Sequence, residues 1–407
     1  MTFHRTTNKK MYNFSRKVNS EHSEDIKVLM QHAVGKHLIS FAGGMPNNDL
    51  FPVSDIDEIY NNLSDEIKKI GFQYGPTSGY PPLVNNLRKY LKKKGLPIYQ
   101  NKLLITTGSL QAISIITQEL INEGDIVLAE NPSFVGALSV FETYRANIIG
   151  IPIDENGIII DELKSTIEKF SRKPKFLYIT PNFHNPAGII YSLERKRQIL
   201  EVLDKTGIIL LEDDAYSDLY FKEENKTLTK PIKSIEGFDV EVIYTGSFSK
   251  ILGPGFRLGW MLASPKIYEK GENIKQALDA CTSNFNQILA NEFLAQAKLE
   301  SYLLFLRTEY FDRKELLQHA LEKYMPKEVT WNEPKGGFYF WLKLPKHLNS
   351  TAIFKKCIEK NVVFVTGRTF DPASKKDDNL RLSFSNMPKN EIEKGIKIIA
   401  EVIKTMM

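Results

Sequence analysis

Cysteine and long apolar runs are both scarce in this chain of 407 residues. Its two cysteines, Cys281 and Cys357, cannot form a disulfide framework, and their spacing is not that of a zinc site. No stretch approaches the roughly 18 apolar residues that a membrane span needs, and the polar, basic N-terminus lacks the apolar core of a signal peptide. We therefore expect a protein of the reducing cytoplasm that does not associate with membranes.

A strong excess of one charge is also missing. The 54 Lys and Arg residues are interleaved with 49 Asp and Glu residues, which leaves a net charge of +5. This pattern predicts a solvated surface and no nucleic-acid site. The densest basic run, residues 88–94, comes at the end of a predicted helix, where the helix dipole favours cations. The seven histidines form no metal-binding cluster, so we expect no metal.

Short apolar runs alternate regularly with helical patterns from about residue 102 onward. The strand-like runs are residues 103–106, 126–129, 148–151, 176–180, 208–211, 240–244 and 258–263. The helical stretches between them are residues 110–121, 135–144, 162–170 and 193–205. This alternation is typical of βαβ units, so it predicts an α/β fold with a mostly parallel seven-stranded sheet flanked by helices.

The pattern changes after about residue 285, where a smaller α+β domain is expected. We predict an N-terminal arm and helix over residues 1–45, a large domain over 46–285 and a small domain over 286–407. Helices are expected at residues 24–34, from a cap at Ser54 to residue 70, and from Pro81, a good first-turn residue. One long helical stretch is expected over residues 286–324.

A lysine in a glycine-rich setting follows the apolar run 240–244. Residues 245–260 contain Lys250, two serines (Ser247 and Ser249), Arg257 and four glycines. Lysine is costly to bury unless it is paired or reactive. Serine hydroxyls and an arginine fork suit a phosphate dianion, and glycine allows the backbone to approach a ligand closely. We interpret Lys250 as the residue that covalently holds a phosphorylated carbonyl cofactor.

Three other polar clusters follow strand-like runs, and in a doubly wound sheet they would meet at one edge. Gly108-Ser109 opens a helix, so it is either an anion site or a plain N-cap. Asp213 could hold a protonated ring nitrogen, whereas Asp214 is expected to be a helix cap or a solvated turn. Tyr216 and Asn185 could donate to a ring oxygen or be ordinary loop residues. Phe134 could stack on the ring or belong to the core.

Two other interpretations of the lysine stretch are disfavoured. Ser247-x-x-Lys250 also occurs in penicillin-interacting hydrolases, but there the serine opens a helix and a Lys-Thr-Gly triplet follows. Here the triplet at residues 205–207 precedes it and a Ser-Asp-Asn element is absent. Gly253-Pro254-Gly255 is not a dinucleotide fingerprint, because the third glycine and the strand-turn-helix context are missing.

As a set, these motifs resemble the class I/II aminotransferases of fold type I, which use pyridoxal 5'-phosphate. The likeness is greater to the branch that contains 2-aminoadipate and kynurenine aminotransferases and the enzyme-like half of MocR-type regulators. The matching motifs are Ser247-x-Ser249-Lys250, Gly255-x-Arg257-x-Gly259-Trp260, Asn185-Pro186-x-Gly188 and Asp213-Asp214-x-Tyr216. Residues 41–46, 51–52, 73–76 and 380–384 extend the match over almost the whole chain.

The resemblance implies a role for each matching residue. Lys250 would form a Schiff base with the cofactor, Asp213 would pair with the pyridine nitrogen, and Asn185 and Tyr216 would bond the ring oxygen. Phe134 would stack on the ring. The phosphate would be held by Ser109, Ser247, Ser249, Arg257 and the backbone N–H of Leu110.

The resemblance also implies how the substrate and a second subunit are engaged. Arg381 would grip the substrate α-carboxylate, and the alternative for this residue is a surface ion pair. Tyr74 would reach the phosphate of a neighbouring subunit, which implies a homodimer. Substrate choice would depend on side chains near Gly43 and on the N-terminal helix. That helix carries Lys27 where this branch usually has an arginine, so a preference for dicarboxylates is in question.

Three functions follow as candidates. The leading one is an aminotransferase (EC 2.6.1.-) that moves an amino group from an L-amino acid to a 2-oxo acid such as 2-oxoglutarate. The second is a C–S lyase or another pyridoxal-phosphate enzyme on the same scaffold, because fold does not determine chemistry. The third is a cofactor-sensing regulator, which is disfavoured because the recognisable match begins near Ile39 and leaves no room for a winged helix.

Overall fold

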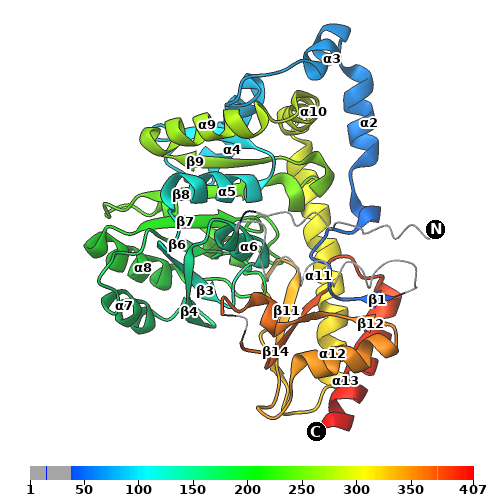
Figure 1. Cartoon of the computed structure of the whole chain (residues 1–407). Coiled ribbons are helices and arrows are strands. Elements are labelled where there is room, and N and C mark those ends of the chain that lie inside the picture. Colours follow the sequence, from blue (N-terminus) through cyan, green and yellow to red (C-terminus); the bar gives the residue numbers. More distant parts are fainter. Residues whose placement is uncertain (1–14, 16–37, 374) are drawn as a thin grey trace, which may run out of the picture.

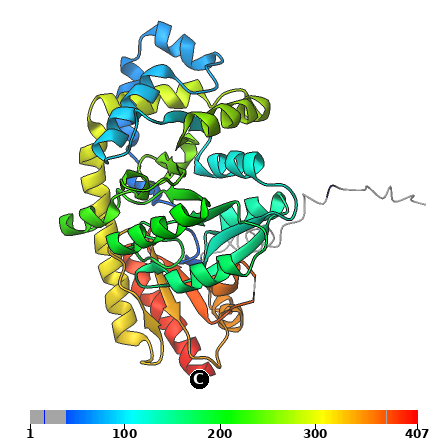
Figure 2. The ribbon, with the colours of Figure 1, turned by 90° about the vertical axis from the view of Figure 1, so that its left-hand side faces the viewer.

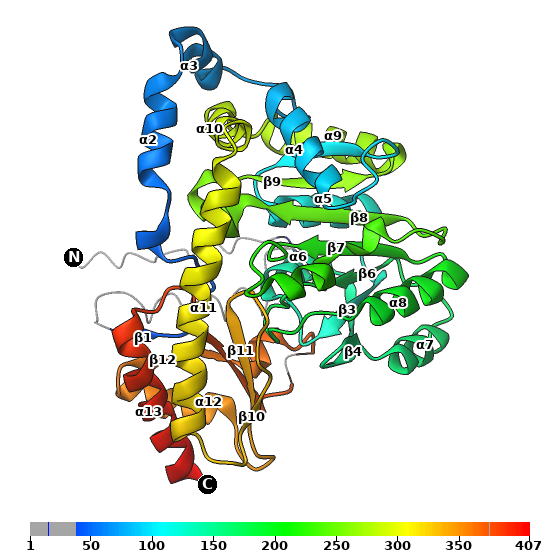
Figure 3. The same ribbon diagram turned by 180° about the vertical axis from the view of Figure 1, so that it is seen from behind.

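A computed structural model describes residues 15, 38–373 and 375–407 (Figure 1). The helix expected at residues 24–34, including Lys27, lies outside the described residues. The described part has a large and a small domain, and the long helix α11 (Lys298–Tyr324) runs along both (Figures 2 and 3). None of the described helices has the length and apolar character required to cross a membrane.

The large domain is built on a sheet whose strands occur in the order β2-β9-β8-β7-β6-β3-β4-β5. Their bounds are β2 Lys102–Thr106, β3 Ile126–Asn131, β4 Asn147–Asp154, β5 Gly157–Ile158, β6 Phe176–Ile179, β7 Ile209–Asp214, β8 Val242–Ser247 and β9 Gly259–Ala263. The central pairs are parallel, and β9 runs antiparallel between β2 and β8. The mostly parallel sheet is confirmed, and β5 adds a two-residue strand to the expected seven.

Helices cover both faces of this sheet, because its strands are apolar on both sides. One face packs Leu128, Leu177 and Leu210 against helices α7 (Ile160–Glu168) and α8 (Leu193–Thr206). The other face packs Phe176 and Tyr178 against α5 (Ser109–Leu120) and α6 (Val135–Thr143). Helix α9 (Pro265–Asp279) lies beside α5, and α4 (Pro81–Lys93) begins at the proline that predicted its start.

The small domain has an antiparallel sheet in the order β10-β11-β14-β13. Its strands are β10 Thr330–Trp331, β11 Tyr339–Lys343, β13 Val365–Thr366 and β14 Asn379–Ser383. Strand β1 (Ile39–Ser40) joins this domain by pairing in parallel with β12 (Val362–Val363). Helices α12 (Ser350–Glu359) and α13 (Lys389–Met406) complete it, and the apolar side of α13 packs against α11. Short 3-10 helices occur at Asn48–Leu50, Glu223–Thr229, Ile232–Ser234, Phe248–Lys250, Pro254–Phe256 and Gly367–Phe370.

The expectation of one helical stretch over residues 286–324 is wrong. Helix α10 spans Asn284–Ala295, and α11 starts at Lys298 after Ala297 adopts a left-handed backbone with φ of 56°. A non-glycine residue in this conformation costs roughly 1–2 kcal/mol. The sequence has no glycine or proline at this position that would predict the end of a helix. Tertiary contacts stabilise it, since Lys298 Nζ lies 2.8 Å from both Asp55 Oδ1 and Glu58 Oε2.

The helix expected from Ser54 to residue 70 is also two helices. Helix α2 (Val53–Asn62) begins before Ser54, which lies in its first turn, and Pro52 occupies the N-cap. A second helix, α3 (Asp65–Phe72), is capped by Ser64, whose Oγ accepts from the N–H of Ile67 at 3.4 Å. Ser64 followed by Asp65 and Glu66 is itself a start signal, so the sequence did contain the information for this break.

Candidate active site

A cavity of about 440 Å³ opens between the two domains, at the carboxyl ends of β2, β7 and β8. Three cations line it among the described residues: Lys250, Arg257 and Arg381. Its large-domain wall comprises Gly108, Ser109, Leu110, Phe134, Val135, Thr180, Asn185, Asp213, Ala215, Tyr216, Ser247, Ser249, Lys250 and Arg257. The other wall comprises Ser40, Ala42, Gly43, Gly44, Met45, Tyr339, Phe354, Val363, Val365, Thr369, Phe370 and Arg381.

One end of the cavity is a cradle for an anion. Helix α5 starts at Ser109 after Gly108 with φ of 86°, and its first N–H groups have no partner within the helix. Ser247 Oγ lies 2.9 Å from Ser249 Oγ, and Arg257 Nη2 is 3.3 Å from the carbonyl oxygen of Thr107. A Cβ on Gly259 would lie 2.6 Å from the backbone nitrogen of Ser109, so glycine is required at this close approach. Free N–H groups, hydroxyls and a guanidinium at one spot suit a phosphate.

Lys250 ends the 3-10 helix Phe248–Lys250 that follows β8, so its side chain enters the cavity from the large-domain wall. Its Nζ donates to the carbonyl oxygen of Gly44 at 2.8 Å. Loss of water around the ammonium group, together with the positive charges of Arg381 and Arg257, lowers the pKa of Lys250 to about 8, although Asp213 opposes this change. A neutral amine that can attack a carbonyl is therefore accessible near neutral pH.

Asp213 is buried at the end of β7 and faces the cavity. Its Oδ1 accepts from Thr245 Oγ1 at 2.9 Å, and its Oδ2 accepts from the hydroxyl of Tyr178 at 3.0 Å. Burial raises the pKa of Asp213 to about 6, and the two hydroxyl groups only partly offset this effect. Within the described part of the chain the carboxylate forms no ion pair, and a protonated ring nitrogen would supply one.

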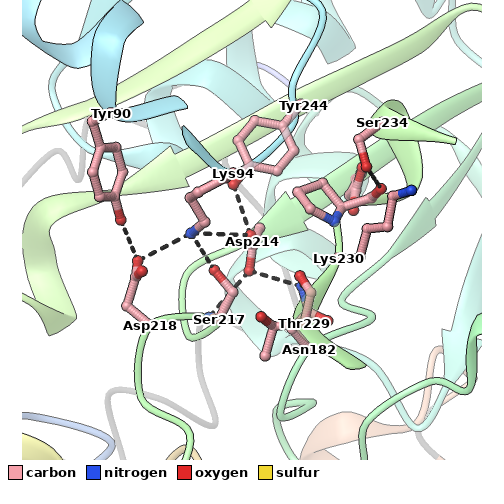
Figure 4. Close-up of polar contacts among 12 residues, drawn as sticks. Tyr90, Lys94, Asn182, Asp214, Ser217, Asp218, Thr229, Lys230, Ser234 and Tyr244 are labelled. Atoms are coloured by element: carbon pink, nitrogen blue, oxygen red, sulfur yellow. Dashed lines mark hydrogen bonds and ion pairs between the residues drawn. The ribbon is translucent and has the colours of Figure 1, made fainter. Parts of the chain in front are cut away.

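Asp214 was expected to be a helix cap or a solvated turn, and the solvated turn is wrong because the side chain is buried in a polar cluster (Figure 4). Its Oδ2 accepts from the hydroxyl of Tyr244 at 2.7 Å and lies 3.9 Å from Lys94 Nζ. Its Oδ1 accepts from Asn182 Nδ2 and from the N–H of Ser217, both at 3.2 Å. The contact with Ser217 does cap the following turn. Asp214 therefore anchors the loop that carries Tyr216.

Tyr216, Asn185 and Arg381 meet on the side of the cavity away from the anion cradle. Arg381 is buried, and its Nη1 donates to Asn185 Oδ1 at 2.7 Å while its Nη2 donates to the carbonyl oxygen of Ala42 at 2.6 Å. Its Nε has no hydrogen-bond partner among the described residues. Since the oxygen of Asn185 is occupied, its N–H groups are the ones available to an acceptor in the cavity. The alternative of a surface ion pair for Arg381 is wrong.

The remaining predicted residues divide into two groups. Phe134, Leu110 and Gly43 line the cavity with the residues above. Tyr74 does not, because its side chain is 83% exposed on the outer surface of the large domain. Lys27 lies outside the described residues. The structure therefore brings together all the predicted site residues that it describes, except Tyr74.

The position of His184, just before Asn185, is explained by a buried carboxylate. His184 Nδ1 accepts from the N–H of Ala187 at 3.1 Å, and Nε2 lies 3.0 Å from Glu130 Oε2. Glu130 also accepts from the hydroxyl of Tyr191 at 2.6 Å and from the N–H of Thr180 at 2.9 Å. These contacts fix the loop that carries Asn185, so His184 supports the site without lining the cavity.

Several lining residues were not predicted from the sequence, notably Tyr339, Phe354, Val363, Val365 and Phe370. They come from β11, α12, the β12–β13 segment and the 3-10 helix Gly367–Phe370. Each is an ordinary apolar or aromatic residue in a strand or helix, which sequence patterns assign to a core. Gly336-Gly337 before β11 and Gly367 at the start of the 3-10 helix are local signals of close approach in this region.

Comparison with known proteins identifies the family. The family described as "Aminotransferase class I and II" matches residues 47–399. The chain is 34% identical to aromatic-amino-acid aminotransferase 1 of Thermococcus litoralis, over 97% of this chain and 94% of that protein. It is 33% identical to 2-aminoadipate transaminase of Thermus thermophilus, over 94% of each. The crystal structure of Pyrococcus horikoshii kynurenine aminotransferase superimposes with a TM-score of 0.92 at 35% identity, covering 97% of this chain and 98% of that one.

The chain belongs to the class I and II aminotransferase family. It is an aminotransferase that uses pyridoxal 5'-phosphate, with the fold of fold type I enzymes. The cavity fits this cofactor on its own evidence: an anion cradle at one end, an amine of lowered pKa, and a buried carboxylate without a cationic partner. Among the described residues, no group of three His, Cys, Asp or Glu side chains is placed to bind a metal ion.

Proposed function

We propose that the amino donor is an L-amino acid with a large apolar or aromatic side chain, and that the acceptor is a 2-oxo acid. The observation that carries this proposal is the composition of the small-domain wall. Phe354, Val363, Val365 and Phe370 give that wall an apolar surface, and Arg381 is its single cation among the described lining residues. A second carboxylate on the donor side chain would lose water there without gaining a partner from the described residues.

Lys250 is the residue that we assign to covalent attachment and to proton transfer. Its amine attacks the cofactor aldehyde when neutral, which its lowered pKa supports. When bound, the cofactor supplies a conjugated, positively charged ring that withdraws electrons from the substrate Cα. Once the substrate amine has displaced it from the cofactor, Lys250 Nζ would be free to move the proton from the substrate Cα to the C4′ position. The carbonyl oxygen of Gly44, 2.8 Å from Nζ, orients the amine.

The large-domain wall would hold the cofactor in this orientation. Asp213 keeps the ring nitrogen protonated, and Tyr216 and Asn185 donate to the ring oxygen. Phe134 packs on the ring face. The phosphate is held by Ser109, Ser247, Ser249, Arg257 and the N–H of Leu110. Each charge-assisted contact is worth roughly 1.5–3 kcal/mol, so four or five of them support tight retention.

Arg381 is assigned to the substrate α-carboxylate. Its Nη2 and its unpaired Nε could donate as a fork, and burial behind Asn185 and Ala42 keeps the guanidinium from moving. Loss of water lowers the pKa of Arg381, and an anionic ligand would restore the lost stabilisation. Gly43 leaves room beside this carboxylate, and Lys27 would contribute only where the donor carries a second acid group.

We propose a cytoplasmic homodimer in which Tyr74 completes the phosphate site of the partner subunit. Exposed apolar side chains support an interface on this side: Phe72 is 79% exposed and stacks on Phe285 with ring centroids 5.8 Å apart. Tyr74 is beside them, exposed and held by a loop whose Gly75 N–H approaches Cys281 Sγ at 3.5 Å. Both cysteines are free thiols, which suits a reducing compartment.

Single-turnover mixing with a panel of amino acids tests the function. Each donor that reacts should convert the yellow enzyme to the pyridoxamine form, and the matching 2-oxo acid should restore the original spectrum. We expect phenylalanine, tyrosine or kynurenine to react at least about tenfold faster than 2-aminoadipate, because a buried unpaired carboxylate costs more than 1.4 kcal/mol. Faster reaction of 2-aminoadipate would overturn the proposed donor class. Release of pyruvate and ammonia without the pyridoxamine form would favour the lyase alternative.

A further inference from the structure

Tyr339 is a cavity residue whose hydroxyl contacts the site from the small domain. It begins β11, and its hydroxyl oxygen lies 2.8 Å from that of Tyr216, the residue assigned to the cofactor ring oxygen. Both side chains are buried, and both line the cavity. The rings meet edge to face, with centroids 5.8 Å apart and planes at 78°. This is a direct polar contact between the two domains at the reacting centre.

The same side chain also contacts the substrate end of the site. The guanidinium carbon of Arg381 lies 4.5 Å from the centroid of the Tyr339 ring, within cation–π range. A Cβ on Gly44 would lie 2.1 Å from the Tyr339 hydroxyl oxygen, so this hydroxyl occupies the space that the glycine leaves open. Gly44 is also the residue whose carbonyl receives Lys250 Nζ. Tyr339 is therefore fixed from three sides.

The protons available on the two hydroxyls determine which tyrosine donates the hydrogen bond. Burial raises the pKa of Tyr216 and of Tyr339, so both hydroxyls carry a proton at neutral pH. Tyr216 has a single proton, and an anionic ring oxygen is a stronger acceptor than a neutral hydroxyl. With Tyr216 donating to the ring oxygen, Tyr339 is left to donate to Tyr216. Hydrogen bonds in series strengthen one another, which makes Tyr216 a better donor.

We propose that Tyr339 is a positioning residue that acts through Tyr216, holding the Tyr216 hydroxyl in the orientation that donates to the cofactor ring oxygen. This rests on the proposed role of Tyr216. The consequence is a stabilised anionic ring oxygen at neutral pH, and a dependence of that stabilisation on the small domain. An alternative in which Tyr339 only fills space predicts that its hydroxyl has no effect on the ring oxygen.

The test is the pH at which the visible absorption of the bound cofactor changes, measured in Tyr339→Phe, Tyr216→Phe and the double variant. Removal of a donor to the ring oxygen raises this pH, because the anionic form loses stabilisation. We expect a rise of about 0.3–0.7 units in Tyr339→Phe and a larger rise in Tyr216→Phe. The double variant should match Tyr216→Phe alone, since Tyr339 acts only through Tyr216. Tyr302→Phe is the matched control: it removes a hydroxyl that donates to the carbonyl oxygen of Leu50 at 3.0 Å, outside the cavity, and should leave the pH unchanged.

Three results would overturn the proposal. One is an unchanged pH in Tyr339→Phe while Tyr216→Phe shifts it, and another is a double variant in which the two shifts add. If Tyr216→Phe itself produces no shift, the assignment of Tyr216 fails first and the proposal fails with it. The melting temperature of the cofactor-free variants distinguishes a folding defect from a local effect. We expect Tyr339→Phe and Tyr302→Phe to lower it by similar amounts, because each removes one buried hydrogen bond.

Discussion

The cavity has two halves of different origin and character. The half assigned to the cofactor comes from short, contiguous segments at strand ends of the large domain, residues 108–110, 213–216 and 247–257, and it is rich in charge and hydroxyl groups. The half assigned to the substrate side chain comes from β11, α12, the β12–β13 segment and the 3-10 helix Gly367–Phe370, and it is mostly apolar. The cofactor half can hold its ligand by strong, directional polar contacts. The substrate half can select a side chain by how well it fits an apolar surface.

The energetic consequence of this difference is visible in the titrating groups. Before the cofactor binds, Asp213 in the polar half has a raised pKa and Lys250 has a lowered pKa. The charged form of each group is therefore less stable in the folded protein than in the unfolded chain. The cofactor would relieve both. The apolar half has no such charges apart from Arg381, so substitutions there should alter substrate choice with little effect on cofactor affinity.

The largest expected effect comes from Lys250→Ala, which removes the nucleophile and the proton carrier together. We expect the rate of transamination to fall by about 10⁴-fold or more, because water cannot substitute for a residue that is both the nucleophile and the proton carrier. Borohydride reduction followed by intact-mass measurement should find the cofactor mass on the wild-type chain and none on the variant. A remaining cofactor adduct would show that another residue forms the covalent bond.

The next largest effect comes from replacing one arginine in each half of the cavity. Arg381→Met should lower kcat/KM by about 10²–10³-fold, since it removes a charge-assisted fork to the α-carboxylate and leaves the phosphate contacts in place. Arg257→Met is the matched control on the cofactor half: it should raise the cofactor Kd by about 10–150-fold, with a smaller effect at saturating cofactor. Equilibrium dialysis of the cofactor and steady-state kinetics measure the two quantities. Equal effects of both variants on cofactor Kd would remove the division into halves.

The same division explains what the sequence could predict. Parallel strands end at one edge of a sheet, so Ser109, Asp213 and Lys250 are placed together once the strands are recognised. Polar and charged residues directly after buried strands are unusual, so these residues are recognisable as candidates for a functional site. Phe354 and Val363 are not recognisable in this way, because an apolar residue in a helix or strand is assigned to the hydrophobic core. Their position in the cavity depends on how the small domain packs.

Two of the errors in prediction have a common cause, namely contacts between residues far apart in the chain. Asp214 was expected to be a helix cap or a solvated turn, and its contacts with Lys94 and Tyr244 in the interior exclude the solvated turn. The break at Ala297 depends on the ion pairs of Lys298 with Asp55 and Glu58, more than 230 positions earlier. Local patterns contain neither contact. The break at Ser64 is different, because a capping signal was present there.

Two adjacent carboxylates offer a comparison within β7. Asp213→Asn should stabilise the cofactor-free protein by about 1–2 kcal/mol at pH 8, since a buried carboxylate without a cation is destabilising. The pKa of Asp213 is raised to about 6, so the folded state binds the proton more tightly than the unfolded state. The resulting destabilisation is absent below the unfolded pKa near 4, grows as pH rises to about 6, and is complete above it.

Asp214→Asn should act in the opposite direction, lowering stability by about 1–3 kcal/mol, because it weakens the contacts with Tyr244 and Lys94. Urea unfolding of the cofactor-free proteins at pH 5 and pH 8 measures both effects. Asp213→Asn should also lose most activity, because an amide does not hold the ring nitrogen protonated. If Asp213→Asn destabilises the protein as much as Asp214→Asn does, the two carboxylates share a structural role and the contrast fails.

The smallest expected effect is the pH dependence of cofactor loading onto the cofactor-free enzyme. The pKa of Lys250 is about 8, so the neutral amine makes up about a tenth of the population at pH 7 and about nine tenths at pH 9. The rate of covalent attachment should therefore rise about tenfold between these values and level off above them. Stopped-flow absorption at saturating cofactor measures this rate. Arg381→Met removes a nearby positive charge, so its midpoint should lie at a higher pH. An unchanged midpoint would mean that burial and Arg257 lower the pKa of Lys250 without Arg381, and that the substrate half does not influence the cofactor half before substrate binds.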